Sequence, residues 1–333
     1  MKRTLMAAVA LLICMSAGTA QAAPARFTLQ GGPSASAQGA GSSCADAVTS
    51  APTGPATVSA TSTAFGKVLV IGGGNYAGCS LYLLTSDQLH ALSGADFACS
   101  DNPNPLGAPC DSVLWPTLLT DGRPIAGPGI NPTLLGTVTR SDLPGLPDVQ
   151  QVTYAGSPLY RFVFDETPGE TEGANLFDPV TSPAGTWYLV DPSQGLPATG
   201  RAQLRLESAP IDGTGPVETV LAATMNNDFS VFPDESFPVY TLSTDSGHAS
   251  ACQGQCALTW QPVLTSGPPE VGAGVDRHAL GIIVRPDGTH QVTYNGEPLY
   301  LFVQDAYIQG IVGTQGIYGA GRSTPWGVFN TPV

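Results

Sequence analysis

The chain has 333 residues and a formal net charge of −14, from 26 acidic and 12 basic residues. A surface this acidic repels nucleic acid and anionic lipid, so the composition argues against both partners. Only 11% of the residues are charged, while glycine and proline number 40 and 30, which predicts many short strands joined by turns. The length predicts two domains.

Residues 1–22 are typical of an export signal. A short basic start and the apolar stretch Met6–Met15 precede the sequence Ala-Gln-Ala at residues 20–22, a site for signal peptidase. A membrane-spanning helix needs about 20 apolar residues, which neither this stretch nor any later one supplies. Cys14 lacks a convincing lipobox, so we expect soluble export to the periplasm or outside the cell without a lipid anchor.

Residues 23–60 are rich in Ala, Ser, Gly, Thr and Pro and predict a flexible leader. Six cysteines follow the signal: Cys44, Cys79, Cys99, Cys110, Cys252 and Cys256. An even number in an exported chain predicts three disulfides. Proximity in the sequence favours Cys99–Cys110 and Cys252–Cys256, which leaves Cys44–Cys79, and the other pairings stay open.

The chain contains an internal duplication. Residues 150–160 (QQVTYAGSPLY) and 290–300 (HQVTYNGEPLY) differ at only three positions, and residues 135–140 match residues 280–285. The later copy predicts a three-stranded meander, because a Pro-Asp-Gly turn and an Asn-Gly hairpin turn separate β-rich runs. Its strands are expected at residues 281–285, 290–294 and 298–303.

A shorter period lies within the duplication. The pattern Tyr-x4-Asp occurs four times and a single tryptophan follows each occurrence: Tyr82, Asp87 and Trp115; Tyr160, Asp165 and Trp187; Tyr240, Asp245 and Trp260; Tyr300, Asp305 and Trp326. Two cysteines precede the tryptophan in the first and third quarters, whereas the second and fourth share the meander. The order is therefore A-B-A-B. We expect an all-β fold of two tandem β-sandwich or barrel-like repeats, residues 61–200 and 201–333. The alternative is a single four-bladed, propeller-like ring.

Residues 252–262 (CQGQCALTWQP), 285–288 and 291–300, with the Tyr-x4-Asp pairs, resemble a family of secreted repeats, often lipoproteins, of unknown function. The resemblance covers about residues 66–333. It implies an exported repeat protein but no particular activity. The chain departs from the family pattern in lacking a lipobox, in the wide spacing of Cys99 and Cys110, and in losing the acidic Pro-Gly loop from its last quarter.

Strand alternation favours a structural role for the Tyr-x4-Asp motif. Residues five apart lie on opposite faces of a regular strand, so a tyrosine and its own aspartate cannot touch without a bulge. The residue two positions after each tyrosine is apolar, which predicts a buried stripe, with the aspartate capping the turn that follows. The alternative is that several aspartates converge on a cation such as calcium. The tryptophans are expected to fill the core instead of forming sugar platforms.

We expect no cofactor. A metal site at His248, Cys252 and Cys256 is the alternative, since their spacing allows thiolate and imidazole ligands, but an oxidising compartment favours a disulfide there. The sequence lacks the signatures of serine hydrolases, zinc proteases and phosphate-binding loops. We therefore expect an exported non-catalytic protein with a binding or structural role. A periplasmic metal-binding or redox accessory protein is the first alternative, and a carboxylate-based glycan hydrolase is the second.

Overall fold

The computed structural model describes residues 43–47, 49, 51–88, 96–100, 110–111, 113–146, 148–178, 181, 183–210, 215–224, 236–246, 249–303, 305 and 326–328. The expected export signal and most of the expected leader lie outside these residues.

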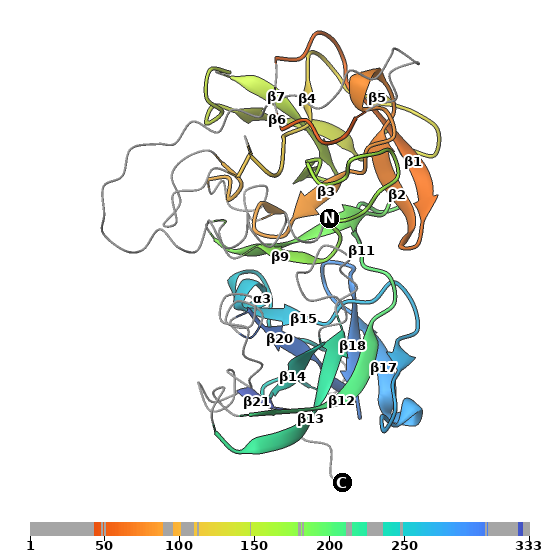
Figure 1. The fold of residues 1–333 in the computed structure, drawn as a ribbon, viewed down its shortest axis with the longest axis vertical. Helices are drawn as coiled ribbons and strands as arrows, with labels where there is room; N and C mark the ends of the chain where they lie inside the picture. Colours follow the sequence, from red (N-terminus) through yellow and green to blue (C-terminus); the bar gives the residue numbers. More distant parts are fainter. Residues whose placement is uncertain are drawn as a thin grey trace, which may run out of the picture.

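Strands make up nearly all the regular structure, and Figure 1 shows them in two bodies, β1–β11 above and β12–β21 below. The first body contains β1 (Thr57–Thr63), β2 (Gly66–Ile71), β3 (Tyr82–Leu84), β4 (Leu119–Thr120), β5 (Ile125–Ala126), β6 (Leu135–Arg140), β7 (Val149–Tyr154), β8 (Ser157–Pro158), β9 (Leu176–Asp178), β10 (Gly185–Val190) and β11 (Pro197–Ala198). The second contains β12 (Gln203–Pro210), β13 (Val217–Thr224), β14 (Ser236–Leu242), β15 (Trp260–Pro262), β16 (Glu270–Val271), β17 (Leu280–Val284), β18 (His290–Tyr294), β19 (Glu297–Pro298), β20 (Tyr300–Phe302) and β21 (Trp326–Val328). Where the structure describes a helical segment in full, it is α3 (Gln255–Thr259) or one of the 3-10 turns η1 (Gly74–Tyr76) and η2 (Arg277–Ala279).

The predicted all-β class is confirmed. The described strands form several sheets, and none of these closes into a barrel. Within the same residues, no helix is long and apolar enough to cross a membrane.

The same strand pairings occur in both bodies. The hairpin β1–β2 has β5 added in parallel to β1, and the hairpin β12–β13 has β16 added in parallel to β12. The hairpins β6–β7 and β17–β18 each carry a short third strand, β8 or β19. Beside β3, Trp187 of β10 pairs with Leu84, and beside β14, Trp326 of β21 pairs with Leu242 in the same register.

The tyrosine strands lie at the centre of each body. Tyr82 and Tyr160 pair antiparallel, with the Tyr82 N–H donating to the Tyr160 carbonyl at 2.8 Å and the reverse bond at 3.0 Å. Tyr240 and Tyr300 pair in the same way between β14 and β20. Two tyrosines far apart in the sequence are therefore direct neighbours across a strand pair in each body.

The predicted meander is present, but its third strand is not continuous. Asn295 and Gly296 form the tight turn with φ of 50° and 83°, and β19 then pairs with β18. The chain leaves this sheet at Leu299 and continues as β20 between β14 and β15. Leu299 joins the two sheets: its N–H donates to the Val292 carbonyl of β18, and its carbonyl accepts from the N–H of Val263, which follows β15. The expected strand 298–303 is therefore shared by two sheets.

Each body has two clusters of buried apolar residues. One lies between the hairpins; the other surrounds the tyrosine strands and the tryptophans. The second pair of clusters positions the side chains of the Tyr-x4-Asp motif.

Candidate functional site: the tyrosine–aspartate network

The four motif tyrosines are fully buried, with 0% of each side chain exposed. The residue two positions further along each strand, Leu84, Phe162, Leu242 or Phe302, is buried on the same face. Alternation along the strand accounts for this stripe, since residues i and i+2 point the same way. A buried phenol needs a hydrogen-bond partner, and the partner defines the site.

Each tyrosine donates its hydroxyl hydrogen bond to the aspartate of the other motif in the same body. The four bonds are Tyr82 to Asp165 (2.7 Å), Tyr160 to Asp87 (2.6 Å), Tyr240 to Asp305 (2.7 Å) and Tyr300 to Asp245 (2.7 Å). None of these tyrosine hydroxyls bonds the aspartate of its own motif within the described contacts. The sequence could not identify these partners, because each lies 55 to 83 residues away along the chain.

The aspartates reach the tyrosines because each strand turns after its buried stripe. The Asp87 N–H donates to the Leu84 carbonyl at 3.1 Å, and Asp165 makes the same bond to Phe162. The second carboxylate oxygen then accepts backbone N–H groups from the following loop, such as that of Glu172 on Asp165 at 2.8 Å. Asp87 and Asp245 accept comparable bonds from Ala98 and Ala251.

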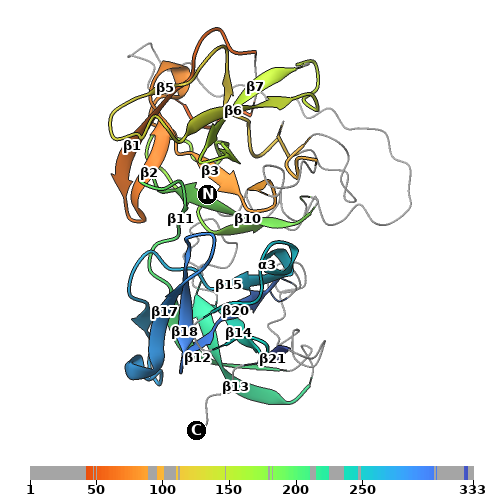
Figure 2. The same ribbon diagram turned by 180° about the vertical axis from the view of Figure 1, so that it is seen from behind.

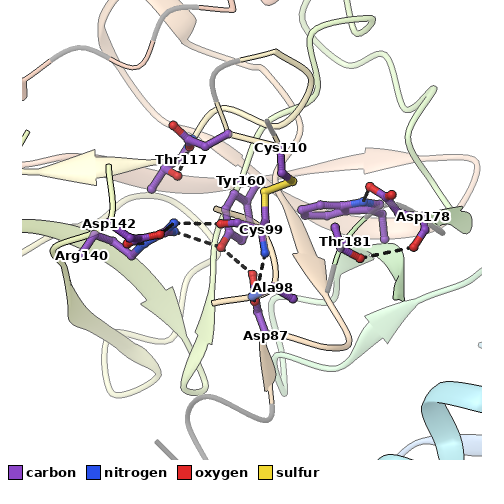
Figure 3. Close-up of a disulfide and its surroundings, with 12 residues drawn as sticks. Asp87, Ala98, Cys99, Cys110, Thr117, Arg140, Asp142, Tyr160, Asp178 and Thr181 are labelled. Carbon is purple, nitrogen blue, oxygen red and sulfur yellow. Dashed lines mark hydrogen bonds and ion pairs between the residues drawn. A yellow bond between two sulfur atoms is a disulfide. The ribbon is translucent and has the colours of Figure 1, made fainter. Parts of the chain in front are cut away.

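A buried arginine joins one tyrosine–aspartate pair in each body. Figure 3 shows the Arg140 guanidinium directed at the Cys99 carbonyl and the Tyr160 hydroxyl, at 2.8 and 3.2 Å. Arg140 also donates to Gln151 at 2.8 Å. Burial opposes the charge of Arg140, but Tyr160, Asp142 and Asp87 raise its pKa above the ordinary value.

Arg285 holds the corresponding position in the second body, but it reaches Tyr300 through Ser250, whose hydroxyl lies within hydrogen-bond distance of Tyr300 at 2.8 Å. Arg285 donates to the Cys252 carbonyl at 2.8 Å, to Gln291 at 2.7 Å and to the Ser250 hydroxyl at 2.7 Å. Sequence reasoning did not single out Arg140, Arg285, Gln151 or Gln291 as site residues. Their signal was present, because the matched segments 135–140 and 280–285 both end in arginine and both glutamines lie in the near-identical segment.

The disulfides are Cys99–Cys110 and Cys252–Cys256, which sequence proximity favoured, and Cys44–Cys79, the pair that these two left. Cys99 and Cys252 supply the carbonyls that accept from the buried arginines, so these two disulfides hold the loops that cover the network. Because Cys252 and Cys256 are bonded to each other, neither is a thiolate ligand in this structure. His248, the third member of the metal hypothesis, lies outside the described residues.

Among the described residues, no three or more His, Cys, Asp or Glu side chains are grouped so that they could hold a metal ion.

The described tryptophan side chains fill the core around the tyrosines. Trp115 and Trp187 stack with ring centroids 3.8 Å apart, and Trp260 stacks on Phe302 at 4.4 Å. Tyr82 meets Trp115 edge-on at 5.4 Å. Their exposed fractions are 7% or less, so these rings offer no open face to a sugar. Trp326 belongs to β21 by its backbone, but its side chain lies outside the description.

The two tyrosine–aspartate pairs of the first body differ in charge. Beside Tyr82, the Leu81 N–H donates to the Leu69 carbonyl, and beside Tyr160, the Leu159 N–H donates to the Val152 carbonyl in the same way. Val68, one residue before Leu69, therefore occupies the position of Gln151, one residue before Val152. The pair Tyr82–Asp165 therefore has an apolar neighbour where Tyr160–Asp87 has a glutamine. Burial raises the pKa of Asp165 to about 8, with Glu170 and Glu172 adding to the effect of burial. At Asp87, burial raises the pKa while the Tyr160 bond and Arg140 oppose it.

The fold and this network define an all-β, disulfide-bonded protein with a recurring tyrosine–aspartate core. Residues 149–190 and 281–314 match the model of a family described as a secreted repeat of unknown function. The resemblance found in the sequence is confirmed at these two segments, which begin at β7 and β17 and include Asp165 and Asp305. No curated protein and no solved structure matches the chain. The family match and the disulfides fit an exported protein.

The reciprocal bonding can be tested with double-mutant cycles. We expect Tyr160→Phe and Asp87→Asn to couple by about 1–3 kcal/mol in the free energy of unfolding, because the phenylalanine lacks the donor and the amide has only one oxygen to accept from both Tyr160 and the Ala98 N–H. Denaturant unfolding of the parent, both single variants and the double variant measures this energy. Tyr160→Phe with Asp165→Asn is the control and should give less than about 0.5 kcal/mol. Stronger coupling in the control would mean that each motif bonds within itself.

Asp165 should make the fold more stable in acid than in alkali. Its pKa in the folded state lies above the ordinary 3.8, so its contribution to stability is full below about pH 4 and falls as the pH rises through about 8. We expect Asp165→Asn to lower stability at about pH 5, where its amide faces the Glu172 N–H, but to reduce the loss between about pH 5 and pH 9. Urea unfolding of parent and variant across this range is the measurement. Equal pH dependence in the two proteins would contradict the assignment.

Proposed function

We propose that this protein is an exported, non-catalytic β-repeat protein that acts by binding or as a structural element in the periplasm, in the cell envelope or outside the cell. In this proposal the Tyr-x4-Asp motif is a folding device. The observation that carries it is the burial of the motif acids: Asp87, Asp165 and Asp305 are exposed by 1% or less, and each accepts a tyrosine hydroxyl. A hydrolase acting through these carboxylates would need them open to a substrate and a water molecule.

The proposal includes a tandem arrangement, with residues 61–200 and 201–333 as two repeats, each an A half followed by a B half. The matching strand pairings support it, as do the tyrosine pairs Tyr82–Tyr160 and Tyr240–Tyr300. In a four-bladed ring, each quarter would make the same contact with the next. Within the described strands, Tyr160 pairs with Tyr82 and Thr117 and with no strand of the second body.

Each repeat uses buried residues for folding and leaves its surface residues free to vary, which supports a binding or structural role. Tyrosines, aspartates, tryptophans and the buried arginine are used inside each body, which leaves the outer strands and loops open to variation. Positions that correspond between the two bodies carry different side chains there. Thr137 and Thr139 of β6 stand where β17 has Ile282 and Val284. Such a scaffold keeps one fold while its surfaces diverge.

A thiol and metal assay of the protein purified from the exported fraction tests this function. We expect no free thiol among the six cysteines after unfolding, and no metal at one equivalent per chain by elemental analysis. Reduction should lower the melting temperature, because the disulfides hold the loops over the buried arginines. Stoichiometric metal together with free thiols would instead establish the metal-binding or redox alternative.

The hydrolase alternative needs its own control. Asp245 is the least buried of the four motif acids, so it is the motif carboxylate that a substrate could reach most easily. Asp245→Asn therefore tests whether this carboxylate is catalytic. We expect neither the parent nor this variant to release reducing ends from envelope glycans. Release by the parent that Asp245→Asn abolishes would overturn the non-catalytic assignment.

A further inference from the structure

Strand β17 is an open edge of its sheet. It pairs with β18 on one side, and no described strand pairs with it on the other. Figures 1 and 2 both show β17 at the outer margin of the second body, on opposite sides of the two views. An edge of this kind presents unpaired backbone groups to any chain that can add a strand.

The side chains of this edge are aliphatic and exposed. Ile282 and Val284 are 40% and 66% exposed, and Leu280 on the same face is half-buried. Ile282 and Val284 are two of the five large apolar side chains that are exposed in the described part of the chain. The corresponding strand β6 carries Thr137 and Thr139, both exposed, at the positions of Ile282 and Val284. The fold therefore does not require aliphatic residues at these positions.

Alternate residues of β17 direct their backbone N–H and C=O groups away from β18. The Ala279 carbonyl accepts from Asn295, and the Arg285 N–H donates to Thr289, so the odd-numbered residues face β18. Hydrogen bonding alternates along an antiparallel strand, so Leu280, Ile282 and Val284 direct their N–H and C=O groups outward. The residues with exposed aliphatic side chains are thus also those with outward backbone groups.

We propose that β17 pairs antiparallel with β17 of a second copy of this chain, about a two-fold axis at Ile282. The proposal rests on the proposed function and names a partner for its binding or structural role. Ile282 lies opposite the partner's Ile282, and Leu280 lies opposite the partner's Val284. A two-fold interface uses the same patch on both copies, and this strand is complementary to itself in shape and chemistry.

Charge complementarity favours a second copy over an unrelated strand. The antiparallel pairing brings the end of β17 next to η2, which carries Arg277, toward the end of the partner's β17, where Asp287 lies in the turn that follows the strand. Residues 280–284 contain no acid, so the strand itself avoids the repulsion that the net charge of −14 causes elsewhere. The Asp287 side chain is 54% exposed; its Oδ1 accepts from the Thr289 N–H and hydroxyl, and its Oδ2 lies 3.5 Å from Arg285.

Sedimentation velocity over a range of concentrations tests the pairing in the exported full chain. We expect the mass to rise from one chain toward two, and Ile282→Thr with Val284→Thr to raise the dissociation constant about tenfold or more. The threonines copy β6 of the same protein, so the variant should fold, which its melting temperature would check. Val217→Thr is the control, since Val217 is 68% exposed but lies on β13, and it should leave association unchanged.

Two further variants test the register. Arg277→Glu brings an acid to the end of β17 that approaches the partner's Asp287 and should weaken association several-fold. Ile282→Cys should form an intermolecular disulfide on mild oxidation, because hydrogen-bonded antiparallel pairs have Cα atoms about 5.5 Å apart, within disulfide range. Thr137→Cys on β6 is its control and should stay monomeric on a non-reducing gel.

The proposal is overturned if the parent stays monomeric at all concentrations, if the threonine variant associates as the parent does, or if the assemblies grow beyond two chains. None of these results would bear on the thiol and metal assay, so the two proposals fail separately. Dimers that Ile282→Cys traps and Thr137→Cys does not would establish both the surface and the register.

Discussion

The hydrogen bond from a buried tyrosine to an aspartate of the other half is the interaction on which each body depends. A buried phenol without an acceptor, or a buried carboxylate without donors, costs free energy, and in each body the phenol finds its carboxylate acceptor across the central strand pair, while the carboxylate also accepts N–H groups from the loop that follows it. Neither half can satisfy its own motif, since tyrosine and aspartate leave the strand in different directions. The two halves must fold together, and the motif must appear twice in each body.

The backbone bonds between the tyrosines extend this constraint to the rest of the sheet. With Tyr82 opposite Tyr160, the neighbouring strands of the sheet pair in one register. In this register each tryptophan strand lies beside the tyrosine strand of the other motif. The stacked rings of Trp115 and Trp187 then close the core over both tyrosines. The spacing of tyrosine, aspartate and tryptophan in the sequence thus reflects one antiparallel arrangement with approximate two-fold symmetry.

The approximate symmetry is broken by charge. In the first body, Arg140 and Gln151 lie beside Tyr160, whereas Val68 occupies the position of Gln151 beside Tyr82. Arg140 also needs the Cys99 carbonyl, and the Cys99–Cys110 disulfide holds this carbonyl in place. The arginine thereby makes the disulfide loop part of the core. The two motif segments of the first body therefore differ, since Cys99 and Cys110 follow Tyr82, whereas Arg140 precedes Tyr160.

Much of this was predictable from local patterns and some was not. The all-β class, the hairpin at Asn295–Gly296 and the buried stripe after each tyrosine follow from turn chemistry and alternation, which act over a few residues. The reciprocal bonds join residues 55 or more apart, and a repeat shows only that copies exist, not which copy bonds which. The buried arginines were not predicted, because charged side chains are seldom fully buried. The change of sheet at Leu299 was not predicted, because the same strand pattern is compatible with either sheet.

Because a network of long-range bonds fixes the interior, the outer strands are free to differ. Strands β6 and β17 occupy the same place in their bodies, and a buried arginine ends β6 and directly follows β17, yet one strand exposes threonine and the other isoleucine and valine. Exposed aliphatic residues on an open strand edge invite association, and polar ones at the same position prevent it. A duplicated scaffold can therefore keep one edge soluble and use the other as a contact, and the interior is the same in both cases.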